Sequence, residues 1–116
     1  MIEWDDLLAV PFVRGGRGKA GMDCYGFLIE CFRRDGKALK DIAATPDGDL
    51  EDYMIELNVS ELQDPAPGCA VQFEVGGLLH VGYVVDRRTV LHMTSRGVRL
   101  TPLSALKAPS FFEVAK

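Results

Sequence analysis

The clearest helical pattern of the chain lies in Asp23-Cys24-Tyr25-Gly26-Phe27-Leu28-Ile29-Glu30-Cys31-Phe32-Arg33-Arg34. Four apolar residues recur there at the i, i+3, i+4 spacing of one helix face, namely Phe27, Leu28, Cys31 and Phe32. Asp23 is a good N-cap residue, because its carboxylate can accept a hydrogen bond from a free backbone N–H of the first turn. The pattern predicts a helix from Cys24 to about Arg34, with the Cys24 thiol in the first turn, on or beside the buried face.

The carboxyl-terminal half has the two-residue period of strands. Beyond the turn sequence Asp64-Pro65-Ala66-Pro67-Gly68, apolar and polar residues alternate over 71–75, and Gly76-Gly77 is typical of a hairpin turn. Further strands are predicted at 79–85, 89–94 and near 111–114, and short consecutive strands are antiparallel. Shorter helices are predicted over 4–9 and 49–57. This order predicts an α+β fold in which N-terminal helices pack on an antiparallel β-meander.

Length and composition exclude several classes of protein. The chain has 116 residues, of which 47% are hydrophobic and 26% charged, as expected for one globular domain over 1–116. No apolar run is long enough for a membrane span, and the acidic start of the chain lacks the pattern of a signal peptide. We therefore expect synthesis in the cytoplasm and no membrane partner. The net charge of −4 argues against nucleic-acid binding.

The three cysteines, Cys24, Cys31 and Cys69, are expected to be free thiols, because no C-x-x-C motif occurs and a disulfide framework needs an even number. Cysteines seven residues apart on a helix lie about 10 Å apart along its axis, beyond disulfide range.

The chain has two histidines, His80 and His92, and both fall in one predicted hairpin. A three-residue loop at 86–88 pairs His80 with Thr94 and His92 with Gly82. Directly opposite residues share a face, so both imidazoles project from one face as diagonal neighbours about 7 Å apart. A two-residue loop would place them on opposite faces.

These residues suit activation of a thiol. A cysteine at a helix N-terminus has its thiolate stabilised by the helix dipole, and His80 is placed to accept the Cys24 proton. His92 is placed to orient His80 through a ring-nitrogen hydrogen bond, and backbone N–H groups near Cys24 are candidates for an oxyanion hole. From spacing alone, the alternative is equally open: Cys24 as a small core residue and both histidines as ordinary strand residues.

Cofactor and metal sites find less support, and we expect no cofactor. The glycine-rich loop 14–21 contains G-x-G-x-x-G but lacks the preceding buried strand of a dinucleotide site, and no Ser or Thr follows Gly18-Lys19 as in a P-loop. A calcium loop near Asp47 has Asp52 where glycine is required. Cys24, His80 and His92 are zinc-ligand types, although they equally suffice for a cysteine triad.

Several motifs resemble, in order, those of the NlpC-type papain-like peptidases of bacterial cell walls. They are Phe12-Val13-Arg14-Gly15-Gly16, Gly21-Met22-Asp23-Cys24-Tyr25-Gly26-Phe27, Pro67-Gly68, His80-Val81-Gly82-Tyr83-Val84 and Val90-Leu91-His92. The resemblance covers about residues 11 to 97. It implies a papain-like α+β core that hydrolyses amide bonds in peptidoglycan stem peptides, with Cys24 as nucleophile, His80 as base and His92 as the orienting residue.

The resemblance also assigns substrate-binding positions to Phe12, Asp23 and Tyr25. Phe12 replaces the family's usual tyrosine and cannot donate a hydrogen bond, Tyr25 replaces a usual small residue, and Cys69 replaces the usual Asp after Pro-Gly. Small domains of this kind resemble those carried in phage or phage-like tails, so we expect such a particle to carry the chain to the wall. The alternative is a non-catalytic structural or assembly domain of a phage tail or secretion apparatus with the same fold.

Overall fold

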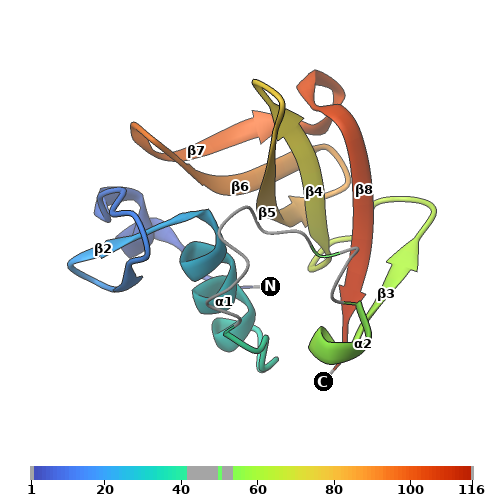
Figure 1. Ribbon diagram of the computed structural model, residues 1–116, viewed down its shortest axis with the longest axis horizontal. Helices are drawn as coiled ribbons and strands as arrows, with labels where there is room; N and C mark the ends of the chain where they lie inside the picture. The colour runs from blue at the N-terminus through green and yellow to red at the C-terminus, as the bar shows by residue number, and fades with distance from the viewer. Residues whose placement is uncertain (1, 42–49, 51–53, 116) are drawn as a thin grey trace.

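The computed structural model describes residues 2–41, 50 and 54–115, and it consists of a small helical region against a large antiparallel sheet (Figure 1). In chain order the elements are η1 (Asp5–Ala9), β1 (Arg17–Gly18), β2 (Gly21–Met22), α1 (Cys24–Arg34), α2 (Met54–Leu57), β3 (Val59–Leu62), β4 (Ala70–Val75), β5 (Leu78–Asp86), β6 (Thr89–Thr94), β7 (Gly97–Pro102), η2 (Leu103–Ala105) and β8 (Lys107–Val114). The α+β class is confirmed.

The sheet is a meander extended by a returning strand. Its order is β3-β8-β4-β5-β6-β7, so β4 to β7 follow one another and β8 comes back to pair with both β4 and β3. The four strands expected from the period-two pattern are present, and Gly76 and Gly77 both have the positive φ of the predicted hairpin turn. Strands β3 and β7 were not predicted. Both are edge strands with few buried side chains, so neither shows a strong apolar alternation.

The predicted helix is confirmed as α1, which begins at Cys24 and ends at Arg34. Asp23 caps it, because its Oδ1 accepts a hydrogen bond from the Gly26 N–H at 2.7 Å. The four residues of the predicted apolar face are fully buried against β5 and β6. An edge-to-face contact between Phe32 and Tyr83, with ring centroids 5.3 Å apart, fixes the helix on β5.

The other predicted helices are only partly matched. The segment at 4–9 forms η1, a 3-10 helix over Asp5–Ala9, instead of an α-helix. Of the predicted helix at 49–57, the structure has α2 over Met54–Leu57, while 49 and 51–53 lie outside the described residues. No helix within the described ranges is long and apolar enough to cross a membrane.

The predicted β5–β6 register is confirmed for Tyr83 with Leu91 and Val84 with Val90, although the turn differs. Asp86 pairs with Thr89, so the turn holds only two residues, and Asp86 Oδ1 closes it by accepting the Arg88 N–H at 2.7 Å. A bulge between Val84 and Asp86 then restores the expected pairing of Tyr83 with Leu91. The two-residue turn and the bulge together give the same register as the expected three-residue loop.

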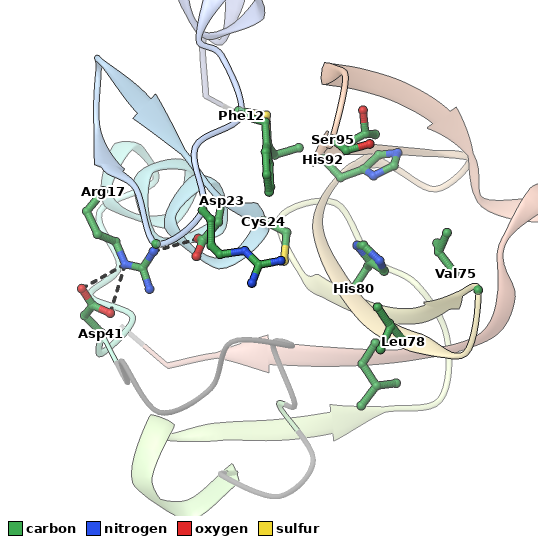
Figure 2. Close-up of a pocket in the computed structure, with 16 residues that line it drawn as sticks. Phe12, Arg17, Asp23, Cys24, Asp41, Val75, Leu78, His80, His92 and Ser95 are labelled. Carbon is green, nitrogen blue, oxygen red and sulfur yellow. Dashed lines mark hydrogen bonds and ion pairs between the residues drawn. The ribbon is translucent and has the colours of Figure 1, made fainter.

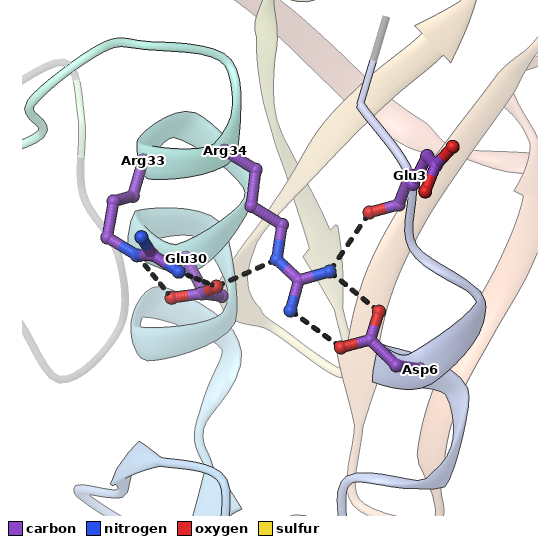
Figure 3. Close-up of polar contacts among 5 residues, drawn as sticks. All are labelled: Glu3, Asp6, Glu30, Arg33 and Arg34. Carbon is purple, nitrogen blue, oxygen red and sulfur yellow. Dashed lines mark hydrogen bonds and ion pairs between the residues drawn. The ribbon is translucent and has the colours of Figure 1, made fainter.

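Arg34 ties the last turn of α1 to the start of the chain (Figure 3). Its guanidinium makes two hydrogen bonds to the Asp6 carboxylate, at 2.7 and 2.8 Å, and a third to the Glu3 carbonyl at 3.0 Å. Its Nε also donates to Glu30 at 2.8 Å. These hydrogen bonds from Arg34 hold the pKa of Asp6 at about 2. Arg34 is therefore the polar link between α1 and η1.

We expect Arg34→Ala to lower the free energy of unfolding by about 1 kcal/mol, because it removes charge-assisted hydrogen bonds between two elements. Arg33→Ala is the matched control, since Arg33 hydrogen-bonds Glu30 within the helix and its side chain is 69% exposed. Denaturant unfolding of both variants tests this. Equal losses in the two variants would contradict the link.

Candidate active site

One pocket, of about 730 Å³, opens where the N-terminus of α1 meets β5 and β6 (Figure 2). Cys24 from α1, His80 from β5 and His92 from β6 all line it. Phe12 from the loop before β1 and Leu78 from the β4–β5 hairpin provide apolar walls. The structure thus brings together the three residues that the sequence assigns to thiol chemistry.

The two histidines lie on one face of the sheet, as predicted. The ring of Phe73 on β4 contacts both: it stacks on His80 with centroids 6.1 Å apart, and it meets His92 edge-on at 5.4 Å. Gly82 makes room between the strands, because a Cβ at this position would lie 3.0 Å from His92 Cβ and closer still to Val90. The expected pairings of His80 with Thr94 and of His92 with Gly82 are not made, since the β5–β6 ladder ends at Tyr83 and Leu91.

Cys24 reaches this face from the other side of the sheet. Val81, Tyr83, Leu91 and Met93 belong to the core around α1, whereas Val84 and Val90 belong to a second cluster. By alternation along each strand, the histidines share the face of that second cluster. Cys24 is the first residue of α1. Its sulfur lies against the backbone N–H of Val81, a residue of β5 that is not paired with β6.

The surroundings of Cys24 favour the protonated thiol. The residue is 9% exposed, and burial raises the pKa of its thiol, with a further rise from the Asp23 carboxylate. Backbone N–H groups of Val81, Tyr25 and Cys24 itself lower this pKa. Ionisation of the sulfur therefore depends on a neighbouring proton acceptor. Cys31 and Cys69 are buried free thiols whose pKa values burial also raises.

His92 is held in the neutral form. Burial, together with smaller effects of the nearby His80 and Arg99, lowers its pKa from 6.5 to about 4. Arg99 stands directly opposite His92 in the β6–β7 ladder. The Nε2 atom of His92 is 2.7 Å from Oγ1 of Thr101 on β7. Sequence reasoning missed Thr101 because β7 itself was not predicted.

Asp23 and its neighbours form a charged wall of the pocket. Asp23 Oδ1 accepts from Arg17 at 2.7 Å, and Arg17 Nε lies 3.1 Å from both carboxylate oxygens of Asp41 (Figure 2). The glycine-rich loop rests directly on the first turn of α1. This close contact is possible because Gly26 has no Cβ, which would overlap the Gly16 carbonyl oxygen. No local pattern in the sequence indicates that Arg17 and Asp41 meet.

The three expected substrate-binding residues divide into two groups. Phe12 and Asp23 line the pocket, and the Phe12 side chain is partly exposed there. Tyr25 does not line it: its ring is fully buried and its hydroxyl donates to the Lys40 carbonyl at 2.6 Å. Because Tyr25 follows Cys24 on the helix, its side chain turns toward the core and away from the pocket that Cys24 lines.

Among the described residues, no group of three or more His, Cys, Asp or Glu side chains is arranged to hold a metal ion.

Comparison with known proteins places this geometry in a family. A family model described as the NlpC/P60 family matches residues 9–112, a range that includes the pocket residues from Phe12 to His92. The chain is also similar to a solved structure described as the NlpC/p60 domain of peptidoglycan hydrolase SagA. The two share 19% identity, with a TM-score of 0.61 over 95% of this chain and 90% of that one, which shows a common fold. A comparison with curated protein sequences finds no match. The chain belongs to the NlpC/P60 family.

Proposed function

We propose that this chain is a cysteine peptidase that hydrolyses amide bonds in peptidoglycan stem peptides, with Cys24 as nucleophile, His80 as general base and His92 as the orienting residue. Membership of the NlpC/P60 family supports a peptidoglycan hydrolase, and the similar SagA domain is described as part of one. The observation that carries the proposal is that the helix-terminal cysteine and both histidines of the chain line one pocket.

The reaction proceeds by acyl transfer. His80 takes the Cys24 proton as the sulfur attacks the carbonyl carbon of the substrate, and the same proton then passes to the leaving amine as the C–N bond breaks. Water hydrolyses the resulting thioester, with His80 again as base, and restores the thiol. Backbone N–H groups at the start of α1 stabilise the negative oxygen of the tetrahedral intermediate.

The electrostatics favour different roles for the two histidines. The raised pKa of the Cys24 thiol means that the thiolate forms only when a base holds its proton nearby. His92 is a poor candidate for that base, because its lowered pKa of about 4 and the facing Arg99 keep it neutral. A neutral His92 is suited to accept a hydrogen bond from His80 and to orient it.

One observation favours the rival function, a non-catalytic assembly domain in a phage tail or secretion apparatus. Phe12 lines the pocket but has no hydroxyl to donate toward a developing oxyanion. Such a domain would keep the fold and the pocket without turnover, so the two functions differ in whether purified peptidoglycan is cleaved.

Digestion of purified peptidoglycan, with mass analysis of the fragments, tests the proposal. The parent chain is expected to release stem-peptide fragments, and Cys24→Ala to release none while its melting temperature stays nearly unchanged. His80→Ala should lose about three orders of magnitude in rate, because the proton acceptor is gone. His92→Asn should retain more activity than His92→Ala, since an amide can still hydrogen-bond a ring nitrogen.

Cys31→Ala is the matched control, because this buried thiol lies on the same helix away from the pocket. Loss of folding in Cys24→Ala would support the reading of Cys24 as a core residue. A folded parent that cleaves nothing would support the assembly domain.

The low pKa of His92 predicts a pH-dependent stability. Between about pH 6.5 and pH 4 the unfolded chain binds a proton at His92 that the folded chain does not bind, so the folded state loses stability as the pH falls through this range. The full loss amounts to about 3 kcal/mol. Denaturant unfolding at pH 7 and pH 4.5 should show a smaller decrease for His92→Asn than for the parent. The same decrease in both would contradict a buried neutral His92.

A further inference from the structure

Thr101 contacts the site from outside the pocket. Its hydroxyl lies 2.7 Å from Nε2 of His92, and the residue is absent from the pocket lining. In the β6–β7 ladder Thr101 stands opposite Val90, and Arg99 stands opposite His92. Thr101 is therefore a diagonal neighbour of His92 on the face that carries both histidines. A group in this place can act on the reaction only through the His92 ring.

The direction of this hydrogen bond determines which nitrogen of His92 carries the proton. A neutral imidazole has one N–H and one lone pair. If the Thr101 hydroxyl donates to Nε2, the proton of His92 is on Nδ1. If Nε2–H donates to Thr101, Nδ1 has the lone pair and can accept a hydrogen bond from His80. Only the second arrangement suits an orienting residue for a general base.

We propose that Thr101 is a positioning residue that accepts a hydrogen bond from Nε2–H of His92 and so fixes the tautomer in which Nδ1 accepts from His80. This inference rests on the proposed function, because it assumes that His80 is the base that His92 orients.

Phe73 and Arg99 do not make this selection. Phe73 meets the ring edge-on and constrains its plane, but an aromatic ring does not distinguish a nitrogen with a proton from one without. Arg99 disfavours the cationic ring, which keeps His92 neutral without choosing between its two tautomers. The Thr101 hydroxyl is a directional group at one defined nitrogen. The same hydroxyl also prevents rotation of the imidazole out of alignment.

Thr101→Val and Thr101→Ser form the matched pair of variants. Valine keeps the branched shape that suits β7 and removes the hydroxyl, whereas serine keeps the hydroxyl. We expect Thr101→Val to lower kcat about tenfold with KM nearly unchanged, and Thr101→Ser to stay within about threefold of the parent. Melting temperatures of both variants check that each has folded. A folded Thr101→Val that is as active as Thr101→Ser would overturn the proposal.

Nitrogen-15 NMR of the histidine side chains provides a readout that does not depend on turnover. The chain has only two histidines, so His80→Ala assigns both sets of ring signals. At pH 7 the parent should show His92 protonated at Nε2, with an N–H signal that is protected from exchange and loses that protection in Thr101→Val.

Protonation of His92 at Nδ1 would overturn the proposal. A parent that shows the protected Nε2–H but cleaves no peptidoglycan would contradict the proposed function alone, and the assignment of Thr101 as the acceptor for His92 would stand.

Discussion

One face of α1 is buried against β5 and β6, and this packing positions the groups of the site. Phe27, Leu28, Cys31 and Phe32 are fully buried there. Burial of large apolar side chains contributes roughly 1.5–3 kcal/mol each, so the buried face as a whole outweighs any single polar contact in the site. Because the helix is fixed in this way and begins at Cys24, the thiol has one available position, at the end of the β5–β6 ladder.

The polar groups at the two ends of α1 add to the apolar packing that positions the Cys24 thiol, and they do not replace it. Asp23 caps the first turn and receives Arg17, while Arg34 joins the last turn to η1. A neutral, buried His92 lines the pocket from the other face of the sheet, with Thr101 behind it. The chemistry is thus assembled at a point where helix, sheet and glycine-rich loop meet, and each element is held by contacts outside the pocket.

Local patterns predicted the elements that bury a periodic apolar face. Helix α1, its Asp23 cap and the central strands all follow from the spacing of apolar residues and from turn residues. Edge strands β3 and β7 lack such a face, and no local signal reports that β8 returns between β3 and β4. The prediction that both histidines lie on one face was correct, although it assumed a three-residue loop. The structure has a two-residue turn, and the bulge after Val84 offsets this difference.

Contacts between segments distant in sequence were the hardest to predict. Arg17 meets Asp41 across 24 positions, and Thr101 reaches His92 through an unpredicted strand. The direction of the Tyr25 side chain, within the family motif, was also not predictable from the sequence. Its position beside Cys24 suggested a substrate contact, but the helix turns its side chain into the core.

If His80 activates Cys24, the rate of alkylation of the Cys24 thiol depends on His80 near neutral pH. The parent and His80→Ala are treated with iodoacetamide between pH 5 and pH 10, and each cysteine is followed by peptide mass analysis. At pH 7 we expect Cys24 of the parent to react much faster than Cys31 and Cys69, and about tenfold or more faster than Cys24 in His80→Ala. If Cys24 reacts at the same rate with and without His80, and only at strongly alkaline pH, His80 does not activate the cysteine.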